Sequence, residues 1–577
     1  MNRNEVAAAL SEIGTLLELL GENPFKTRAY GNAARLIKSM DQDLPTLVEK
    51  GELDSLKGIG KALAEKITLL VRDGRLPYLD ELRARVPPGL LDWLRIPGLG
   101  PKKVRAIHLA LGISTLGELE YACQENRLRD LDGFGQASQD KILPGIDRLR
   151  RNAGRFLQPV VQQEADRLLE LVRGVPGVIR AEVAGSVRRR SETSKDIDIV
   201  VASPDPEPVM EQFAASDQVE EITGRGPTKC SVVLKSGPSA DLRVVDELSF
   251  PFTVMYFTGS KDHNIAMRSR ARAAGLKLNE YGLVPENGGD SLPCADEAAI
   301  YSALDLPYIE PELREDLGEL EAGSQGELPA LVSDSDICGI LHCHSTWSDG
   351  SASIADMASA CRERGYTYLG ISDHSQAASY AGGLSPAQVL EQHEEIDRLN
   401  ADLNGTFTIL KGIEVDILAD GKLDYPDEIM ARFDLVVASV HSRFNLSEQD
   451  QTDRILKALD NPFVDILGHP TGRLLLAREP YALDLRTVVR AAAERNVAVE
   501  VNAHPSRLDL DWRELAVGLR HGLLTSINPD AHSPAGIDHV RHGVGIARKG
   551  WCTPEQALNA WPLPRLQDWL KERRTGR

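Results

Sequence analysis

The sequence predicts a multidomain protein in which an all-helical N-terminal region precedes an α+β middle and a C-terminal α/β barrel. Three Gly-x-Gly turns recur in the first 140 residues, strand-like runs begin after Ala153, and from Ile337 seven short apolar strands alternate with helical stretches. At roughly 100–200 residues per domain, 577 residues accommodate three to five domains.

The helical region is organised around a repeated turn. Its copies are Leu56-Lys-Gly-Ile-Gly60, Ile96-Pro-Gly-Leu-Gly100 and Leu131-Asp-Gly-Phe-Gly135, and the first two lead into predicted helices 61–71 and 101–110. Glycine lets the backbone approach a phosphate, and the N-terminus of the next helix favours an anion. The first two copies resemble helix–hairpin–helix motifs, which implies contacts with a DNA backbone through Gly58, Gly60, Lys61, Gly98, Gly100, Lys102 and Lys103. The third copy lacks basic residues and is expected to be structural.

The charge distribution restricts where nucleic acid can bind. The formal net charge of −20 argues against binding over the whole surface. Residues 55–155, however, contain 18 Lys and Arg against 12 Asp and Glu, so local contacts are expected there.

Two aspartates of the α+β region share one face of a predicted strand. Asp196 and Asp198 lie two residues apart in the run 196–202, and Asp241 opens a further strand-like run, 241–245. Neighbouring carboxylates repel each other unless a cation lies between them, and three carboxylates that hold two divalent ions suit in-line phosphoryl transfer. Upstream, Gly185-Ser-Val-Arg-Arg-Arg190 offers amides, a hydroxyl and guanidinium groups that suit a triphosphate.

Histidines and carboxylates follow the predicted strands of the C-terminal region, which contains 11 of the 13 histidines. Chemistry at the carboxyl ends of consecutive strands is typical of a (β/α) barrel. The candidate ligands are His342, His344, Asp349, His374, Glu414, His441, His469, Asp530 and His532. This mixed set suits Zn, Mn or Fe rather than Mg alone.

Other patterns exclude whole classes of protein. No apolar stretch approaches the roughly 18 residues of a membrane span, and residues 1–20 read as a helix rather than a signal peptide. Seven cysteines without a CxxC pair favour a reducing interior over a disulfide framework. We expect a cytoplasmic, nucleoid-associated protein with no membrane partner.

The central motifs resemble a known family. Gly185-Ser186 followed by Asp196-x-Asp198 is similar to the nucleotidyltransferase signature of family X DNA polymerases, the DNA polymerase beta relatives. Tyr256-Phe-Thr-Gly-Ser260, followed by Asn264 and Arg268, resembles the nucleotide- and template-contacting element of that family. The likeness runs in order over about the first 315 residues. It implies helix–hairpin–helix domains, a nucleotidyltransferase palm and a thumb.

The resemblance also implies a role for each matching residue. Asp196 and Asp198 would bind both metal ions, Mg²⁺ or Mn²⁺, while Asp241 would bind the catalytic ion and take the proton of the primer 3′-hydroxyl. The residues expected to hold the incoming deoxynucleoside triphosphate are Gly185, Ser186, Arg189, Tyr256, Phe257, Gly259 and Asn264. Arg268 would contact the template strand.

A lysine of the first helical region matches the lyase residue of some family members. Lys66, in the context Ala64-Glu-Lys-Ile67, would form a Schiff base with an abasic sugar, and Lys26 and Tyr30 match positions near a 5′-phosphate pocket. Ala62 stands where those members carry another lysine. An exposed helix lysine without this role remains an equal alternative.

The C-terminal region resembles the polymerase-and-histidinol-phosphatase (PHP) domain, a distorted (β/α)7 barrel that binds up to three Mn, Zn or Fe ions. The resemblance implies a Mn-dependent 3′–5′ exonuclease that cleans 3′ ends or abasic sites. One ion would take His342, His344, Glu414 and Asp530. A second would share Glu414 and add His441 and His469, and a third would take Asp349, His374 and His532. Arg443 and Arg473 follow ligand histidines and are candidates to bind the scissile phosphate.

The expected domains are a lyase-like domain (1–84), a helix–hairpin–helix domain (85–152), the palm (153–250), the thumb (251–314), a linker (315–336) and the PHP domain (337–577). The expected function is gap filling in DNA repair with 3′-end processing, by a monomer that binds gapped or nicked DNA. Three alternatives remain: a DNA-end-binding scaffold with one relic site, a small-molecule phosphatase, and a template-independent nucleotidyltransferase.

Overall fold

The computed structural model describes residues 1, 3–40, 44–56, 58–96, 98–129, 131, 133–135, 139, 141–146 and 154–575. The chain divides into two compact units, Met1–Leu149 and Arg150–Arg577. Within the described ranges, no helix combines the length and the apolar character that a membrane crossing requires.

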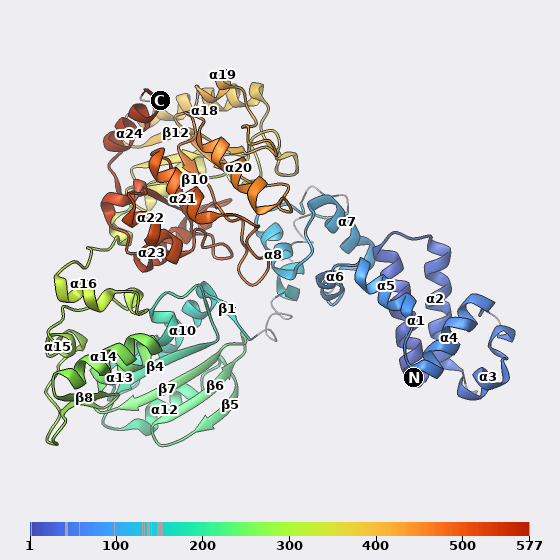
Figure 1. Ribbon diagram of the computed structural model, residues 1–577, viewed down its shortest axis with the longest axis horizontal. Helices are drawn as coiled ribbons and strands as arrows, with labels where there is room; N and C mark the ends of the chain where they lie inside the picture. Colours follow the sequence, from blue (N-terminus) through green and yellow to red (C-terminus); the bar gives the residue numbers. More distant parts are fainter. Residues whose placement is uncertain are drawn as a thin grey trace. The chain divides into compact units, whose positions relative to one another are not determined.

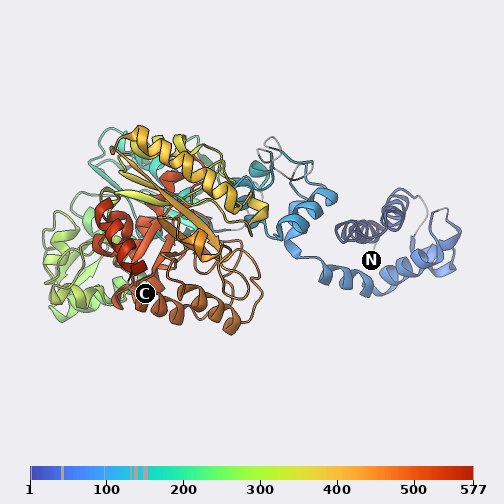
Figure 2. The same ribbon diagram turned by 90° about the horizontal axis from the view of Figure 1, so that it is seen from above.

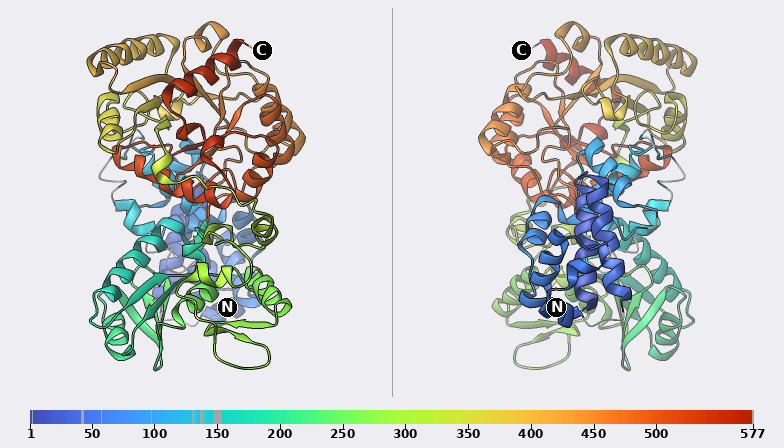
Figure 3. Two further views of the ribbon diagram at one scale, coloured as in Figure 1. Left: turned by 90° about the vertical axis from the view of Figure 1, so that its left-hand side faces the viewer. Right: turned by 90° about the vertical axis from the view of Figure 1, so that its right-hand side faces the viewer.

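The first unit is helical, as predicted (Figure 3). The helices with described bounds are α1 (Arg3–Leu19), α2 (Pro24–Ser39), α3 (Leu44–Lys50), η1 (Leu53–Ser55), α4 (Lys61–Asp73), α5 (Pro77–Arg85), α6 (Pro88–Trp93), α7 (Pro101–Leu111) and α8 (Leu116–Gln124), and residues 141–146 are helical as well. A single hydrophobic cluster extends from Val6 to Ile146 around the fully buried Trp93, so the core continues across residue 84.

The first two Gly-x-Gly turns follow the same backbone path. Gly58 and Gly98 have φ values of 104° and 89°, a region that only glycine adopts readily. Gly60 and Gly100 cap α4 and α7 with φ and ψ of −81° and 167°, and −88° and 169°. The third turn begins alike, with Gly133 at 82°, but residues 136–138 after it lie outside the described ranges.

The second unit begins with a palm built on a five-stranded sheet (Figure 1). The sheet order is β2-β4-β7-β6-β5, in which only β4 and β7 are parallel. The palm elements are β1 (Phe156–Leu157), α10 (Gln158–Arg173), β2 (Arg180–Val183), α11 (Gly185–Arg188), β3 (Thr193–Ser194), β4 (Asp196–Ala202), α12 (Pro206–Ala214), β5 (Val219–Arg225), β6 (Lys229–Leu234) and β7 (Ser239–Val245). Ile197, Ile199 and Val201 of β4 pack with α10 and α12, so the alternate residues face the other side.

The thumb follows the palm and includes part of the expected linker. Its elements are α13 (Phe250–Thr258), α14 (Lys261–Ala273), β8 (Leu276–Asn279), β9 (Gly282–Pro285), α15 (Glu297–Ser302), η2 (Pro311–Leu313), α16 (Glu319–Gln325) and η3 (Asp334–Asp336). Residues 315–336 thus contain a helix: Leu320 joins the thumb core, and the buried Glu319 lies 2.6 Å from Nδ1 of the buried His263.

The C-terminal region is a parallel, nearly closed seven-stranded barrel with helices around it (Figure 2). Its strands are β10 (Gly339–Cys343), β11 (Tyr368–Ile371), β12 (Thr408–Asp416), β13 (Leu435–Ser439), β14 (Ile466–Leu467), β15 (Ala498–Asn502) and β16 (Thr525–Asn528). The helices are α17 (Ile354–Glu363), η4 (Ser379–Ala381), α18 (Pro386–Leu403), α19 (Asp427–Met430), α20 (Glu448–Leu459), α21 (Leu485–Glu494), α22 (Trp512–Arg520), η5 (Pro534–His539), α23 (Val540–Lys549), η6 (Pro554–Gln556), η7 (Leu558–Ala560) and α24 (Leu563–Thr575). A single parallel bridge between Cys343 and Ala531 links the first strand to the chain after the last.

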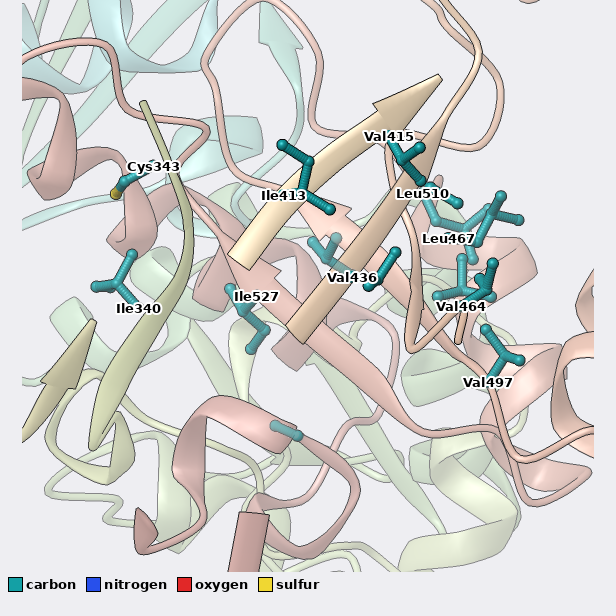
Figure 4. Close-up of a cluster of buried hydrophobic side chains, with 14 of the residues drawn as sticks. Ile340, Cys343, Ile413, Val415, Val436, Val464, Leu467, Val497, Leu510 and Ile527 are labelled. Atoms are coloured by element: carbon teal, nitrogen blue, oxygen red, sulfur yellow. The ribbon is translucent and has the colours of Figure 1, made fainter. Parts of the chain in front are cut away.

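Strand alternation divides the barrel into an outer apolar layer and a lumen. Ile413, Val415, Val436 and Ile527 belong to the outer layer (Figure 4). The residues between them belong to the lumen, where a separate apolar cluster is formed by Leu341, Tyr368, Leu410, Leu435, Val437, Ile466 and Ala498. Further along β12 and β15, the side chains on this lumen side are polar, as Glu414 and Glu500 show. The barrel therefore has an apolar floor below a polar mouth.

Helix α24 closes the floor through a buried ionic cluster. Asp465 is fully buried and lies 3.3 Å from Nε of Arg573 and 2.8 Å from Nη2 of Arg574. Arg573 is 3% exposed and also donates to the carbonyl of Asn496 at 2.8 Å.

Replacement of Arg573 by Met should lower the free energy of unfolding by about 2–4 kcal/mol, because it removes one of the two guanidinium groups that compensate Asp465 and leaves several backbone carbonyls without a donor. Urea titration followed by circular dichroism measures the change. Arg520→Met is the control, since Arg520 is exposed on α22, and it should shift stability by less than about 0.5 kcal/mol. Equal unfolding midpoints for the two variants would contradict the role assigned to the cluster.

Candidate active sites

The palm brings its three aspartates together on the sheet face opposite α10 and α12. Asp196 and Asp198 share that face of β4, and Asp241 pairs directly with Asp198 in the parallel register of β4 and β7. Asp241 is the third residue of β7 rather than its first, and β5 and β6 intervene in the sequence. Burial, together with the charges of Asp196 and Asp241, raises the pKa of Asp198 to about 7.

Such a repulsive carboxylate cluster fits divalent cations. The palm also contains a cation that the sequence did not reveal: Nζ of Lys229 lies 2.9 Å from Oδ2 of Asp241. Lys229 faces Arg243 across β6 and β7, a pairing that carries no local sequence signal.

Gly185 must be glycine for two reasons. Its φ is 65°, and a Cβ at this position would lie 2.2 Å from Oδ2 of Asp198. The next residue, Ser186, has its hydroxyl 2.7 Å from that of Ser194, a second candidate phosphate contact that the sequence interpretation missed.

Arg189 lies where palm and thumb meet. Its Nη1 donates to the carbonyl of Thr258 at 2.5 Å, and its Nε donates to Glu315 at 3.1 Å. Gly259 packs on the same guanidinium, because a Cβ there would be 3.2 Å from Nη1. Arg189, which is predicted to bind the triphosphate, is therefore held in place by a backbone carbonyl and a carboxylate of the thumb segment.

The thumb residues expected to contact nucleotide and template form one local group. The rings of Tyr256 and Phe257 meet edge to face at 5.4 Å, and the guanidinium of Arg243 lies 4.5 Å from the Phe257 centroid. Asn264 donates from Nδ2 to the carbonyl of Tyr256 at 2.7 Å, which leaves its buried Oδ1 without a hydrogen-bond partner in the described part of the chain. Arg268 donates to the carbonyl of Asn264 at 3.2 Å.

The barrel mouth brings the nine candidate ligands into one buried cluster. Glu414 is central: its carboxylate lies 2.9 Å from Nδ1 of His374, 3.2 Å from Nε2 of His441 and 3.0 Å from Nε2 of His469. Three groups have ligand atoms close enough to share an ion: His344, Asp349, His374 and His532; His342, His344 and Asp530; and His374, Glu414 and His441. His344 and His374 thus each belong to two groups, whereas the sequence-based assignment gave each to one ion.

The charges around these residues, and their ring nitrogens without a hydrogen-bond partner among the described residues, favour the binding of metal ions. Burial opposes the protonation of both His374 and His441. The carboxylates of Asp349 and Glu414 nevertheless raise the pKa of His374 to about 10. The carboxylates of Glu414 and Asp416 likewise raise the pKa of His441 to about 10. Nε2 of His342 and Nδ1 of His469 have no hydrogen-bond partner among the described residues. A carboxylate field of this strength attracts divalent cations, and unpartnered ring nitrogens are ready ligands.

Supporting residues around this cluster were not singled out from the sequence. Glu500 accepts from His342 Nδ1 at 2.7 Å and from the His469 backbone amide at 2.8 Å, so it orients two ligands. A buried glutamate inside the apolar run 497–501 was the available signal. Asp373 accepts from the amide and the hydroxyl of Ser345 at 2.7 and 2.6 Å.

Arg473 is not available to a scissile phosphate. Its guanidinium lies 2.8 Å from Glu192 of the palm and 3.0 Å from Asp511, and it donates to the carbonyl of Arg507 at 3.0 Å. It joins barrel to palm instead.

In the first unit, the three residues expected at a lyase site gather around Tyr78 of α5. Nζ of Lys66 lies 5.2 Å and Nζ of Lys26 lies 5.6 Å from the Tyr78 centroid, and the rings of Tyr30 and Tyr78 stack at 6.4 Å. Lys66 also donates to the carbonyl of Ala62 at 3.4 Å. Tyr78 was missed because its aromatic ring has no distinctive neighbours in sequence.

Because an ion binds the ionised form of Asp198, protons compete with it below a pH of about 7. We expect the affinity of the palm for Mn²⁺ to fall about tenfold per pH unit below 7 and to level off above about 8. Electron paramagnetic resonance titrations between pH 5.5 and 8.5 measure this, with the palm ions identified as those lost in Asp198→Asn. A flat affinity from pH 6 to 8 would contradict the assignment.

Four family models match the chain. They are a helix-hairpin-helix domain at residues 1–76, a SAM-like helix-hairpin-helix tandem at 90–146, a DNA polymerase beta thumb at 253–315 and a PHP domain at 341–504. They agree with the helical first unit, the thumb and the barrel seen in the structure.

Curated proteins resemble the chain over different lengths. It is 39% identical to the DNA polymerase/3′-5′ exonuclease PolX of Bacillus subtilis (strain 168) over 573 residues, which is 99% of this chain and 100% of that protein. It is 25% identical to the DNA polymerase lambda of Rattus norvegicus over 324 residues, 50% of this chain and 52% of that one. A probable phosphatase of Thermoanaerobacter sp. (strain X514) is 28% identical over 176 residues, 29% of this chain and 69% of that protein. The chain belongs to the PolX family, the family X DNA polymerases with a C-terminal PHP domain.

Proposed function

We propose that this chain is a DNA polymerase that fills short gaps at its palm and removes or cleans 3′ ends at its barrel. One observation carries the proposal: the chain has two separate clusters of charged side chains, the partly exposed carboxylates of the palm and the buried histidines and carboxylates of the barrel mouth. The full-length likeness to a polymerase/3′-5′ exonuclease supports it. The substrates would be gapped or nicked DNA and deoxynucleoside triphosphates, bound by a monomer near the nucleoid.

At the palm, Ser186, Arg189 and the amide of Gly185 bind the triphosphate, and Asp241 takes the proton of the primer 3′-hydroxyl. Mg²⁺ or Mn²⁺ held by Asp196, Asp198 and Asp241 supplies the positive charge that in-line displacement requires. Lys229, at 2.9 Å from Asp241, offsets part of the negative charge of the trio. Tyr256, Phe257 and Gly259 provide the flat wall that disfavours ribose, with Asn264 at the base and Arg268 at the template.

At the barrel, Mn, Zn or Fe ions held by the nine ligands would supply Lewis acidity and an activated water for hydrolysis of the 3′ phosphodiester. Glu500 keeps His342 and His469 oriented, and the apolar floor excludes bulk water from below. In the helical unit, two open backbone turns are available to DNA phosphates, at Gly58, Gly60 and Lys61 and at Gly98, Gly100, Lys102 and Lys103. Among the described residues beyond the chain neighbours, no atom lies within 4 Å of a Cβ built on any of these four glycines.

On a labelled, one-nucleotide-gapped duplex with Mn²⁺ and deoxynucleotides, Asp198→Ala should reduce primer extension at least about a hundredfold and leave 3′ degradation intact. His344→Ala should do the reverse, because each variant removes a ligand from one site only. The exposed residues Asp217 and His521 provide the matched controls Asp217→Ala and His521→Ala, which should behave as wild type. Loss of both activities in either ligand variant would contradict two independent sites.

We further propose that Lys66 is a lyase nucleophile, whose Nζ attacks C1′ of an abasic sugar and forms a Schiff base with loss of water. Borohydride trapping of a 5′-deoxyribose-phosphate substrate should fall at least about tenfold in Lys66→Ala. Lys50→Ala is the control, because Lys50 is an exposed lysine at the end of another helix, α3. Undiminished trapping in Lys66→Ala would show that Lys66 is an ordinary surface lysine.

A further inference from the structure

We infer that the barrel supplies part of the triphosphate-binding wall of the polymerase site, through Arg513 and Lys549. A cavity of about 320 Å³ is lined by Ser186, Arg189 and Asp196 of the palm and by Trp512, Arg513 and Lys549 of the barrel. It thus contains predicted phosphate ligands and a predicted metal ligand on one side and barrel side chains on the other. The inference rests on the proposed polymerase function and adds two residues to its nucleotide site.

The cavity has the charge that a polyphosphate requires. Five cationic side chains line it, against three acidic ones. The acidic residues are Glu192, Asp196 and Glu315, and two of these already pair with cations: Glu192 with Arg473, and Glu315 with Arg189. The hydroxyls of Ser186, Thr193 and Ser194 add neutral donors to the same wall.

Lys549 is built into this wall rather than placed on the surface. It is 2% exposed at the end of α23, and its Nζ lies 4.6 Å from the Trp512 ring and 3.3 Å from the carbonyl of Arg189. Its ammonium forms an ion pair with Glu315. Burial lowers the pKa of Lys549, and Glu315 counteracts that shift. Lys549 thus places a positive charge, paired with Glu315, at the wall of the cavity.

Glu315 connects the barrel lysine to the palm arginine. Oε1 of Glu315 accepts from Nε of Arg189 at 3.1 Å and also pairs with Lys549. Two cations therefore share one carboxylate at the edge of the cavity. An incoming phosphate competes with Glu315 for both of them, so the strength with which Arg189 holds the nucleotide depends on Lys549.

Arg513 is held in position by a second set of ion pairs. Its Nη1 lies 2.9 Å from Asp511, which also pairs with Arg473 at 3.0 Å, and Arg473 reaches Glu192 of the palm. These linked ion pairs fix the start of α22 against the turn between α11 and β3. The Arg513 side chain is 57% exposed and lines the cavity, so it is accessible to a ligand.

The experiment compares Arg513→Met and Lys549→Met with Arg520→Met, which changes an exposed arginine of the same helix outside the cavity. The readouts are KM and kcat for single-nucleotide insertion, affinity for Mg²⁺–pyrophosphate by calorimetry, and 3′ excision without nucleotides. We expect KM and the pyrophosphate Kd to rise about five- to tenfold in the first two variants, with kcat changed less than about twofold. Excision and all Arg520→Met values should match wild type, and Lys549→Arg should restore most of the affinity.

The outcomes separate the inference from the function on which it rests. If the wild type inserts nucleotides and both variants keep its KM and pyrophosphate Kd, the barrel is not part of the nucleotide site and the inference fails. If the wild type inserts no nucleotide, the proposed polymerase function fails, while the pyrophosphate titration still decides the role of Arg513 and Lys549. If Lys549→Met unfolds, as judged by lost excision, the exposed Arg513 decides alone.

Discussion

The barrel depends on the compensation of one buried charge, the carboxylate of Glu414. This group is 1% exposed, and three histidines meet it within 3.2 Å. An uncompensated carboxylate at this depth would be prohibitively unfavourable, so positive charge must gather around it. The histidines, the ions they suit and the outer ring of Glu500 and Asp416 all follow from that requirement. The apolar floor adds to this requirement, because the cluster below Glu414 consists of buried hydrophobic side chains.

The sequence predicted this part of the molecule well because strand periodicity carries the information. Each of the seven strands reads as a short apolar run followed by polar residues, and side-chain alternation places Glu414, His441, Asp530 and His532 on the lumen side of their strands. His342 follows an irregularity in β10, and His469 lies beyond the end of β14, so alternation alone does not place these two. The same periodicity placed Asp196 and Asp198 together. Glu500, Lys229 and Tyr78 were missed because their roles arise from pairing between segments far apart in the chain, such as Glu500 with His342 at 2.7 Å.

The degree of burial explains why two elements, β5 and α16, were not predicted from the sequence. Strand β5 escaped notice because it is an edge strand whose residues are almost all exposed, so it shows no apolar alternation. Helix α16 resembled a solvated linker because it is acidic. Its Glu319 is nevertheless fully buried, where His263 and the amides of Asp316 and Leu317 satisfy the carboxylate. Composition alone cannot distinguish a solvated acid from one with an internal partner.

The contacts between palm, thumb and barrel have a consequence for how the chain can be divided. Glu192 with Arg473, Glu312 with Arg548 and Glu315 with Lys549 join the two sides of the segment that runs from α16 to β10. The covalent connection through the exposed Gly326 and Glu327 is therefore not what holds the halves together. A chain interrupted there, by a protease or by a split gene, retains a preformed and charge-matched interface, and its two fragments can associate as subunits of one enzyme.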